Sequence, residues 1–472
     1  MARRCFESAI CTAQVRRRPI SHIRYISTNR HLPGKGFSEE VSFQRALFEG
    51  LAPDGGLYMP TTIPTLSTNK ILELAGLSYP EVAFRILSRF LGDELTEEVL
   101  GEICSSAYDF PVPMEALDEE TSLLYLDRGP TASFKDFAAR FMSRTMSAMK
   151  KYDELTTVLV ATSGDTGSAV GEAFRGVDGF RVVILYPARE VSEIQRDQLE
   201  RIGENVRTLR IDGQFDDCQK LVKEAFLDRG LASLKLTSSN SINVGRILPQ
   251  IVYYFYAWAN VCTAEEPLAF SVPSGNFGNS LGCELARRMG LPVRKLVLAV
   301  NENDEFPEFL SSGEYVPLSP SRQCISNAMN VGNPSNLARY FDLYGGHLLP
   351  NGTVKRAPDL SAMRKHLWSV SISDEETRRT IDQTYTEHNT ILDPHGAVGV
   401  TAVRRFREEG FEGKAVVLVT AHPGKFPETV STILGENVEA PPFLAHIVER
   451  SPSVERLSCD YEQFRTYLLD QP

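Results

Sequence analysis

Short apolar runs alternate with amphipathic segments of helical pattern along most of this chain, and that alternation leaves few folds open. The runs are rich in β-branched residues and read TTVLVA from residue 156, FRVVILYP from 180, VRTLRI from 206, LAFSVP from 268, KLVLAV from 295 and KAVVLV from 414. Repeated strand, loop and helix are typical of parallel sheets with helices on both faces. The sequence therefore predicts an α/β class with two doubly wound parallel-sheet domains.

The first quarter of the chain lacks this alternation. Residues 24–115 carry mainly helical patterns and predict a small helical N-terminal unit, in which VSFQRALFEG predicts a helix that ends at Gly50. Residues 116–260 predict a first α/β region and residues 261–472 a second.

Two segments of the second region have clear local signals. Ser373 and Glu376 stand at capping-box spacing and predict the start of a helix. Residues 345–360, GGHLLPNGTVKRAPDL, are rich in Gly, Pro and Asn and predict an exposed loop.

The N-terminal leader, residues 1–23, differs from the rest in composition. It is rich in arginine and small hydroxyl residues, and Glu7 is its single acid. That composition suits a mitochondrial transit peptide, which would direct the protein to the mitochondrial matrix. The alternatives are an extension of no import value or a start codon placed too early, and the expected location is then the cytoplasm.

Charge and cysteine usage exclude several classes of partner. The net charge of -11 and the pI near 5.4 argue against a nucleic-acid partner, because phosphates would be repelled. No apolar run approaches the roughly 18 to 20 residues that cross a bilayer, which argues against a membrane protein. The scattered cysteines form no C-x-x-C pair and the histidines no H-x-x-x-H pair, so no metal is predicted and a reducing compartment is favoured.

Two glycine-rich loops follow apolar runs and precede helical patterns. They read ATSGDTGSA, residues 161–169, and PSGNFGNS, residues 273–280. Small residues let backbone N–H groups approach an anion, and a helix N-terminus adds about half a positive charge. Either loop alone could be only a tight connection. Neither has the spacing of a P-loop or of a dinucleotide fingerprint, so no nucleotide is predicted.

Lys135 follows a Gly-Pro-Thr turn in LDRGPTASFKDFAARFM, with Phe134 before it and Phe137 and Phe141 on the next turns. A surface lysine paired with Asp136 would explain this residue by itself. A Schiff-base lysine, however, needs a partly desolvated amine on a rigid mount, and this position offers both. A reactive lysine, a cradle for a cofactor phosphate and a cradle for a substrate carboxylate are together what a pyridoxal phosphate enzyme requires.

The chain resembles the threonine synthase family, of the longer bacterial and fungal type. The matching motifs run in order through LFEGLAPDGGLYMP, GPTASFKDFAARFM, ATSGDTGSAV, SSNSINVGRILPQ, SVPSGNFGN, NAMNVGNPSN, DPHGAVGV and TAHPGKFPETV, and cover nearly everything after the leader. The resemblance implies the tryptophan-synthase-like fold, also called fold type II, and pyridoxal 5′-phosphate as cofactor. It also implies a lyase of threonine biosynthesis that converts O-phospho-L-homoserine and water to L-threonine and phosphate.

The resemblance also implies roles for particular residues. Lys135 would form the aldimine with the cofactor, and Thr420 would place a hydroxyl against its pyridine nitrogen. The cofactor phosphate would be held by Gly275, Asn276, Phe277, Gly278 and Asn279. The substrate carboxylate would be gripped by Ser163, Gly164, Asp165, Thr166 and Gly167. Further substrate contacts would come from Asn240, Ser241, Asn243 and Arg246. The candidates for the cation beside the leaving phosphate are Arg246, Lys425 and Arg128.

Some residues depart from the family pattern. The family usually shows His at the position of Arg128, Leu-Ala at Ala132-Ser133 and Asp at Asn330. These departures leave open a related enzyme that performs γ-elimination or γ-replacement on a similar amino acid. A non-catalytic binding protein would be expected to lose Lys135 or the phosphate loop, and a dehydratase of the same fold lacks the LAPDGGLY and TAHPGKF segments. The family includes both monomers and homodimers.

Overall fold

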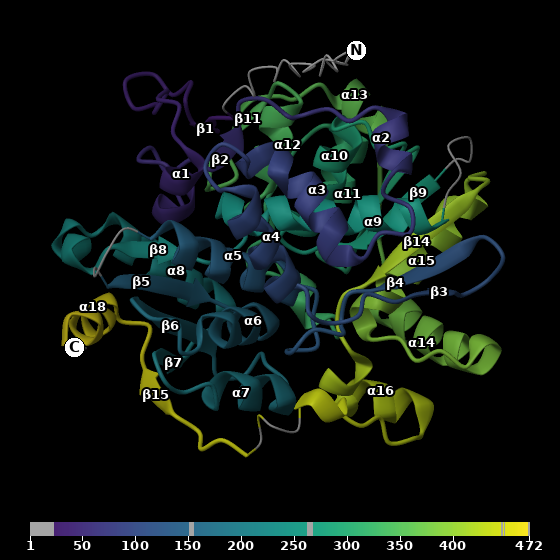
Figure 1. Cartoon of the computed structure of the whole chain (residues 1–472). Helices are drawn as coiled ribbons and strands as arrows, with labels where there is room; N and C mark the ends of the chain where they lie inside the picture. The colour runs from purple at the N-terminus through teal and green to yellow at the C-terminus, as the bar shows by residue number, and fades with distance from the viewer. Residues whose placement is uncertain (1–22, 151–154, 262–267, 445–446, 448, 471–472) are drawn as a thin grey trace, which may run out of the picture.

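A computed structural model describes residues 23–150, 155–261, 268–444, 447 and 449–470, and its larger sheet has six strands in the order β13-β10-β9-β14-β4-β3 (Figure 1). Apart from Ile23, the predicted leader lies outside the described residues. The strands are β3 (Met114–Ala116), β4 (Thr121–Tyr125), β9 (Leu268–Pro273), β10 (Lys295–Val300), β13 (Leu367–Ser371) and β14 (Lys414–Val419). All neighbours are parallel except β3, which pairs antiparallel with β4.

The second sheet has five strands in the order β15-β7-β6-β5-β8, and all its pairs are parallel. Its strands are β5 (Thr156–Ala161), β6 (Phe180–Pro187), β7 (Val206–Ile211), β8 (Leu236–Ser238) and β15 (Val454–Leu457). Every residue of β5 and of β6 is buried. Continuous burial of this kind requires cover on both faces, which explains why these strands are unbroken apolar runs.

Each sheet is assembled from distant parts of the chain. β4 lies beside β14, with Thr121 opposite Ala415, and β15 lies beside β7, with Val454 opposite Thr208. In Figure 1 the yellow C-terminal segment runs next to the blue strands, where α18 (Tyr461–Asp470) contacts α8 (Phe215–Leu227). The boundaries expected at residues 116 and 261 therefore separate chain segments that share a sheet.

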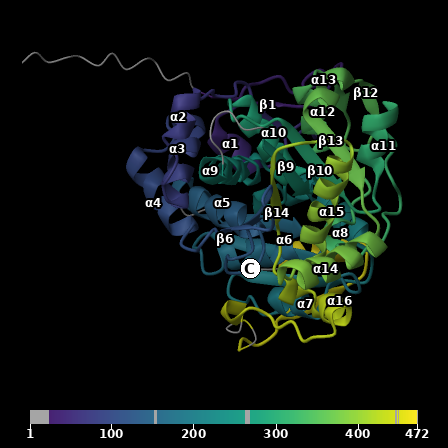
Figure 2. The same ribbon diagram turned by 90° about the vertical axis from the view of Figure 1, so that its right-hand side faces the viewer.

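Helices cover both faces of each sheet. In β14, Val416 and Leu418 pack into the cluster that contains α10 (Gly278–Arg288), whereas Val417 and Val419 pack into the cluster that contains α15 (Pro394–Glu408). Figure 2 shows α15 and α14 (Asp374–His388) together on their side of this sheet. Alternate side chains of β5 divide in the same way between α6 (Asp165–Phe174) and α8. The predicted α/β class of fold type II is confirmed.

The remaining helices complete these layers and the N-terminal unit. They include α1 (Phe43–Glu49), α2 (Thr68–Leu72), α3 (Tyr79–Leu91), α4 (Glu97–Ala107), α5 (Lys135–Met149), α7 (Glu193–Glu200), α9 (Val252–Val261), α11 (Glu305–Ser312), α12 (Leu337–Leu343), α13 (Leu360–His366) and α16 (Pro427–Leu434). The N-terminal unit also holds the antiparallel pair β1 (Tyr25–Ser27) and β2 (Tyr58–Pro60). It packs through α3 against α9 and through α4 against α5. Of the helices in the described ranges, none has both the length and the apolar character needed to span a bilayer.

Local predictions can be compared with these bounds. α1 ends at Gly50, whose φ of 71° lies in the left-handed region, and Ser373 and Glu376 form the capping box of α14, so both helix predictions are confirmed. The prediction of an exposed loop over 345–360 is confirmed for most of residues 350–357 and wrong for residues 346–348, which are buried. β11 (His347–Leu348) and β12 (Val354–Arg356) form a short antiparallel hairpin there, because buried Leu348 anchors one strand.

Glu305, at the start of α11, is a buried acid whose Oε2 has no hydrogen-bond partner among the described residues. Burial raises the pKa of its carboxyl to about 8, so the folded protein holds this proton more tightly than the unfolded chain does. The stability that the neutral group contributes is present below pH 4.5 and is lost as pH rises through 8.

Replacing Glu305 with Gln is therefore expected to flatten the fall in unfolding free energy between these pH values by about 1.4 kcal/mol per pH unit. Urea unfolding from pH 5 to 9 measures this slope. Glu308→Gln, on the exposed face of the same helix, is the matched control and should keep the wild-type slope. An unchanged slope in the Glu305→Gln protein would show that the acid is ionised in the fold.

Candidate active site

A cavity lies at the carboxyl ends of both parallel sheets, where the loops after β5, β9 and β14 meet. Of the residues predicted for the site, the cavity is lined by Lys135, Ser163, Thr166, Asn240, Ser241, Arg246, Gly275, Asn276, Gly278, Asn279 and Thr420. Those that do not line it are Gly164, Asp165, Gly167, Asn243 and Phe277. The fold thus brings residues from both sheets, predicted separately, to one place.

Lys135 is the first residue of α5 and is fixed by a backbone bridge to the segment after β14. Ser133 pairs with Ala421, the Phe134 N–H donates to the Thr420 carbonyl at 2.9 Å, and the His422 N–H donates to the Ala132 carbonyl at 3.1 Å. This bridge sets Lys135 beside Thr420. The lysine side chain is only 12% exposed, and its Nζ lies 4.7 Å from the centre of the Phe134 ring.

The Lys135 amine shares a buried carboxylate with a second lysine. Its Nζ lies 3.1 Å from Oδ2 of Asp165, while the Nζ of Lys425 lies 2.7 Å from Oδ1. Burial lowers the pKa of the Lys135 amine, an effect that Asp165 opposes and that Lys425 and Arg246 reinforce. Burial raises the pKa of Asp165, but the two ammonium groups and the Gln195 amide more than offset this and hold it well below its usual range.

The loop 275–279 presents unused hydrogen-bond donors to the cavity. Among the described residues, none accepts a hydrogen bond from a backbone N–H of this loop. The Phe277 ring turns away and packs on Phe306 and Tyr340, so that residue offers only its backbone. Free N–H groups at the N-terminus of α10 fit a phosphate, as pyridoxal phosphate requires. The Thr420 side chain also makes no hydrogen bond to a described residue, and it lines the same cavity.

Gly275 lies where a side chain would close this cradle. A Cβ there would come within 2.8 Å of the Ala328 carbonyl oxygen and 3.0 Å of the Met329 Cα, both of which are backbone atoms. Gly275→Ala is therefore expected to displace the loop and raise the dissociation constant for pyridoxal phosphate at least about tenfold, the cost of roughly one charge-assisted hydrogen bond. An absorbance titration of the apo protein measures this constant.

The control is Gly101→Ala in α4, where an added Cβ meets no atom within 4 Å. That change should leave cofactor binding as it is and add up to about 1 kcal/mol of stability, because alanine is the better helix former. Equal cofactor affinity in the two variants would mean that the loop does not need a glycine for this ligand.

The loop 163–167 is shaped by Thr162. The N–H groups of Gly164 and Gly167 donate to its hydroxyl at 3.0 and 2.9 Å, which leaves Ser163 and Thr166 to face the cavity. Asn240 reaches the cavity as well, and its amide donates to the Ala161 carbonyl at 2.7 Å. Its contact fixes the end of β5.

Asn243 has a structural place instead. Its amide is fully buried, donates to the carbonyls of Leu47 and Ser238 at 2.8 Å each, and accepts from the Gly245 N–H. It therefore joins α1 to the segment after β8. The expectation that Asn243 lines the cleft does not match this position.

Of the three cations considered for the leaving phosphate, only Arg246 lines the cavity. It is 3% exposed, donates to the Ser239 carbonyl at 2.6 Å, and its Nε has no partner among the described residues. Burial lowers the pKa of this guanidinium to about 10, with Asp136 opposing the effect. Arg128 instead stacks on Tyr125, 4.9 Å from the ring centre, and Lys425 is committed to Asp165.

Two side chains that sequence reasoning did not single out support the phosphate loop, Asn336 by direct contact and Arg339 through Asn336, to whose Oδ1 it donates at 2.6 Å. Asn336 donates to the Ser241 hydroxyl at 3.1 Å and to the Asn276 carbonyl at 2.9 Å. Fully buried Arg339 donates to the carbonyls of Ser241, Ile242 and Tyr58. Both belong to the segment that opens with the NPSN motif, which was the available signal.

His395 supports the part of the cavity lining that contains Ala328. Its Nε2 accepts a hydrogen bond from the N–H of Ala328, a lining residue, at 3.2 Å. The ring proton therefore sits on Nδ1, which lies 2.6 Å from a carboxylate oxygen of Asp393. The DPHG motif carries both residues. Asn330 lies outside the lining, where its amide holds the backbone of Cys324.

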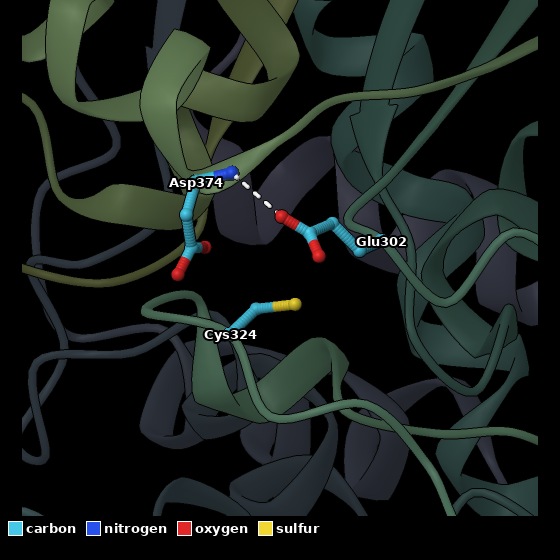
Figure 3. A group of neighbouring side chains, drawn as sticks. All are labelled: Glu302, Cys324 and Asp374. Carbon is cyan, nitrogen blue, oxygen red and sulfur yellow. Dashed lines mark hydrogen bonds between the residues drawn. The ribbon is translucent and has the colours of Figure 1, made fainter.

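Glu302, Cys324 and Asp374 form a separate group beyond the ends of β10 and β13, with one potential metal-ligating atom from each within 4.8 Å of the others (Figure 3). Both carboxylates already accept backbone hydrogen bonds. Glu302 accepts from the Asp374 N–H at 3.2 Å, and Asp374 accepts from the Ile325 N–H at 3.1 Å. These contacts account for the group as a tie between the strand ends and the start of α14.

Comparisons with known proteins agree with this geometry. Residues 24–108 match the family model for the threonine synthase N terminus, residues 112–422 that for pyridoxal-phosphate dependent enzymes, and residues 396–468 that for the threonine synthase C-terminal region. The threonine synthase of Serratia marcescens is 38% identical over 440 residues, which are 93% of this chain and 98% of the relative.

Solved structures give the same result. The crystal structure of threonine synthase from Escherichia coli has 36% identity and a TM-score of 0.85, and covers 95% of this chain and 99% of its own. The threonine synthase from yeast has 30% identity and a TM-score of 0.85, with 96% and 99% covered. With its sequence, its fold and the composition of its cavity in agreement, this chain belongs to the threonine synthase family of pyridoxal-phosphate dependent enzymes.

Proposed function

We propose that this protein converts O-phospho-L-homoserine and water to L-threonine and phosphate, with pyridoxal 5′-phosphate as its cofactor. The observation that carries the proposal is the meeting of Lys135, Thr420, Arg246 and the loop 275–279 around one cavity in a chain of the threonine synthase family. The substrate is a small phosphorylated amino acid, and for its phosphate this cavity offers the buried guanidinium of Arg246.

The residues that would hold the cofactor all follow strands of the six-stranded sheet: Lys135 follows β4, the loop 275–279 follows β9, and Thr420 follows β14. The Lys135 amine would bind its aldehyde, the N–H groups of the loop 275–279 would bind its phosphate, and the Thr420 hydroxyl would interact with its pyridine nitrogen. When bound, the cofactor supplies an electron sink for negative charge that develops on the substrate. A hydroxyl is a neutral partner, so it leaves the pyridine nitrogen largely unprotonated and moderates that sink.

The substrate would lie between the two glycine-rich loops. Ser163 and Thr166 bind its carboxylate at the start of α6, Asn240 and Ser241 contact its chain, and Arg246 binds the phosphate that leaves from Cγ. The environment of Arg246 supports this assignment. Its guanidinium is buried and its Nε has no hydrogen-bond partner among the described residues, so a bound anion would stabilise it by supplying that partner.

Lys135 would also carry the protons. Its Nζ would take one proton from Cα and one from Cβ, deliver a proton to Cγ once phosphate has left, and return a proton to Cα after the hydroxyl of water has added at Cβ. A base of this kind works best when its pKa lies near the working pH. Burial lowers the pKa of the Lys135 amine toward that range, which supports this role.

Incubation with O-phospho-L-homoserine and cofactor, followed by separate assays of phosphate and threonine, tests the proposal. Equal amounts of the two products are expected. Phosphate without threonine would support the alternative of γ-elimination, which the comparisons do not favour, and the absence of both products would contradict the proposed activity.

A further inference from the structure

Lys425 is the second cation on Asp165, and it is more deeply buried than Lys135. It ends η5 (Pro423–Lys425), just after β14, and its side chain is 0% exposed. Besides its contact with Asp165 at 2.7 Å, its Nζ donates to the Thr131 carbonyl at 2.9 Å. Thr131 belongs to the Gly-Pro-Thr turn that leads to Lys135. Lys425 therefore links the loop after β5 to the mount of the reactive lysine.

The two lysines have different freedom. Lys135 lines the cavity, whereas Lys425 does not, and the Lys425 ammonium contacts the Asp165 carboxylate and the Thr131 carbonyl. The Asp165 carboxylate is 1% exposed, and Gln195 donates to its Oδ1 at 2.9 Å. Removing the cation from a buried carboxylate is strongly unfavourable, because the charge is then left without water or a partner. If Lys135 were its sole cation, Asp165 would resist every step in which that amine becomes neutral.

We propose that Lys425 is a positioning residue that supplies the lasting counter-charge of Asp165, so that Lys135 is free to lose its proton. The inference rests on the proposed function, in which Lys135 attacks the cofactor aldehyde as a neutral amine. The charged groups that face Lys135 are Asp165 on α6, Lys425 on η5 and Arg246 on η2 (Val244–Arg246), and Asp136 on α5 faces Lys425. Without Lys425, Lys135 would be the sole lysine paired with Asp165 among the described residues, and the carboxylate would stabilise the ammonium form of Lys135.

The test follows the rate at which the apo protein gains the visible absorbance of lysine-bound pyridoxal phosphate, as a function of pH. In Lys425→Met the midpoint of this profile is expected to rise by about one pH unit or more, the effect of an opposite charge at contact distance. Lys70→Met, at a lysine whose side chain is 55% exposed, is the matched control and should keep the wild-type midpoint. A Lys425→Met midpoint equal to the wild-type one would overturn the inference.

A double variant separates charge from packing. Asp165→Asn combined with Lys425→Met removes both members of the pair, so the midpoint is expected to fall below that of Lys425→Met. This comparison also excludes Asp136 as the cause. Asp136 is the same residue in both variants, so a change in its titration could not lower the midpoint of the double variant relative to that of Lys425→Met. A double variant that keeps the raised midpoint would contradict the inference.

Thermal unfolding gives an answer even if Lys425→Met does not fold. Asp165→Asn leaves two ammonium groups around an amide, whereas the double variant leaves one, so the double variant is expected to have the higher Tm. An equal or lower Tm would overturn the inference. Failure of the linkage between Lys135 and the cofactor, the part of the proposed function on which the inference rests, would look different, because wild-type protein would then show no cofactor band at any pH. Failure of threonine formation alone would leave both the band and its pH midpoint measurable.

Discussion

Lys135→Ala is expected to lose the visible absorbance of lysine-bound pyridoxal phosphate and to lower kcat about 10³-fold or more, because one side chain supplies both the cofactor linkage and the proton transfers. The bridge between Ser133 and Ala421 holds the amine next to Thr420. Among the described lysines, Lys135 is the one that lines the cavity. Absorbance spectra and the rate of threonine formation at saturating cofactor measure the two effects.

Two further variants separate the causes of that loss. Lys135→Arg keeps a cation near Asp165 but cannot form the same linkage, so it should be as inactive as the alanine variant while retaining more thermal stability. Lys70→Ala, on an exposed helix, should match wild type in both measurements. A Lys135→Ala protein that still forms threonine at a tenth of the wild-type rate would exclude this lysine as the principal base.

Arg246→Met is expected to lower kcat/KM for O-phospho-L-homoserine by about 10- to 100-fold, the worth of a charge-assisted hydrogen bond of roughly 1.5–3 kcal/mol. The guanidinium is 3% exposed and its Nε is unpaired among the described residues, so a bound phosphate would complete its hydrogen bonding. Initial rates across substrate concentrations measure the effect, and cofactor absorbance should stay near the wild-type value.

Arg128→Met is the matched control for that variant. Arg128 stacks on Tyr125 and lies 3.5 Å from a carboxylate oxygen of Asp127, outside the cavity lining. Its side chain is 30% exposed and lies outside the cavity lining, so its loss should change kcat/KM by less than about threefold. A larger loss of kcat/KM in Arg128→Met than in Arg246→Met would assign the leaving phosphate to Arg128. It would also support the hypothesis that an arginine at this position, where the family usually has histidine, changes the substrate.

Much of the fold is predictable because strands buried on both faces must be continuous apolar runs. β5, β6, β9, β10 and β14 follow from that rule, whereas β7 departs from it, since Arg207 and Arg210 interrupt its sequence and are only partly buried. β4 and β15 do not follow from it either, since each is short and lies beside a strand far along the chain. β11 and β12 lie in a segment whose Gly and Pro residues hide the buried anchor Leu348. The residues of a short strand do not indicate which distant strand will pair with it.

The site divides in a similar way. Lys135 and the two glycine-rich loops are predictable because the chemistry restricts their residue types. The contact of Lys425 with Asp165 depends on η5 reaching α6, which only the assembled fold brings about. Asn243 and Arg128 stand within or beside family motifs, yet one caps backbone carbonyls and the other stacks on Tyr125. A motif fixes which residues are near the site but not which way each side chain turns.

The most direct test of the central claim is to reduce the cofactor-loaded protein with borohydride, digest it and locate the modified peptide by mass spectrometry. The expected result is a single reduced pyridoxal phosphate adduct on Lys135, in the peptide that contains GPTASFKDF. An adduct on Lys425 or on another lysine, with Lys135 unmodified, would contradict the assignment.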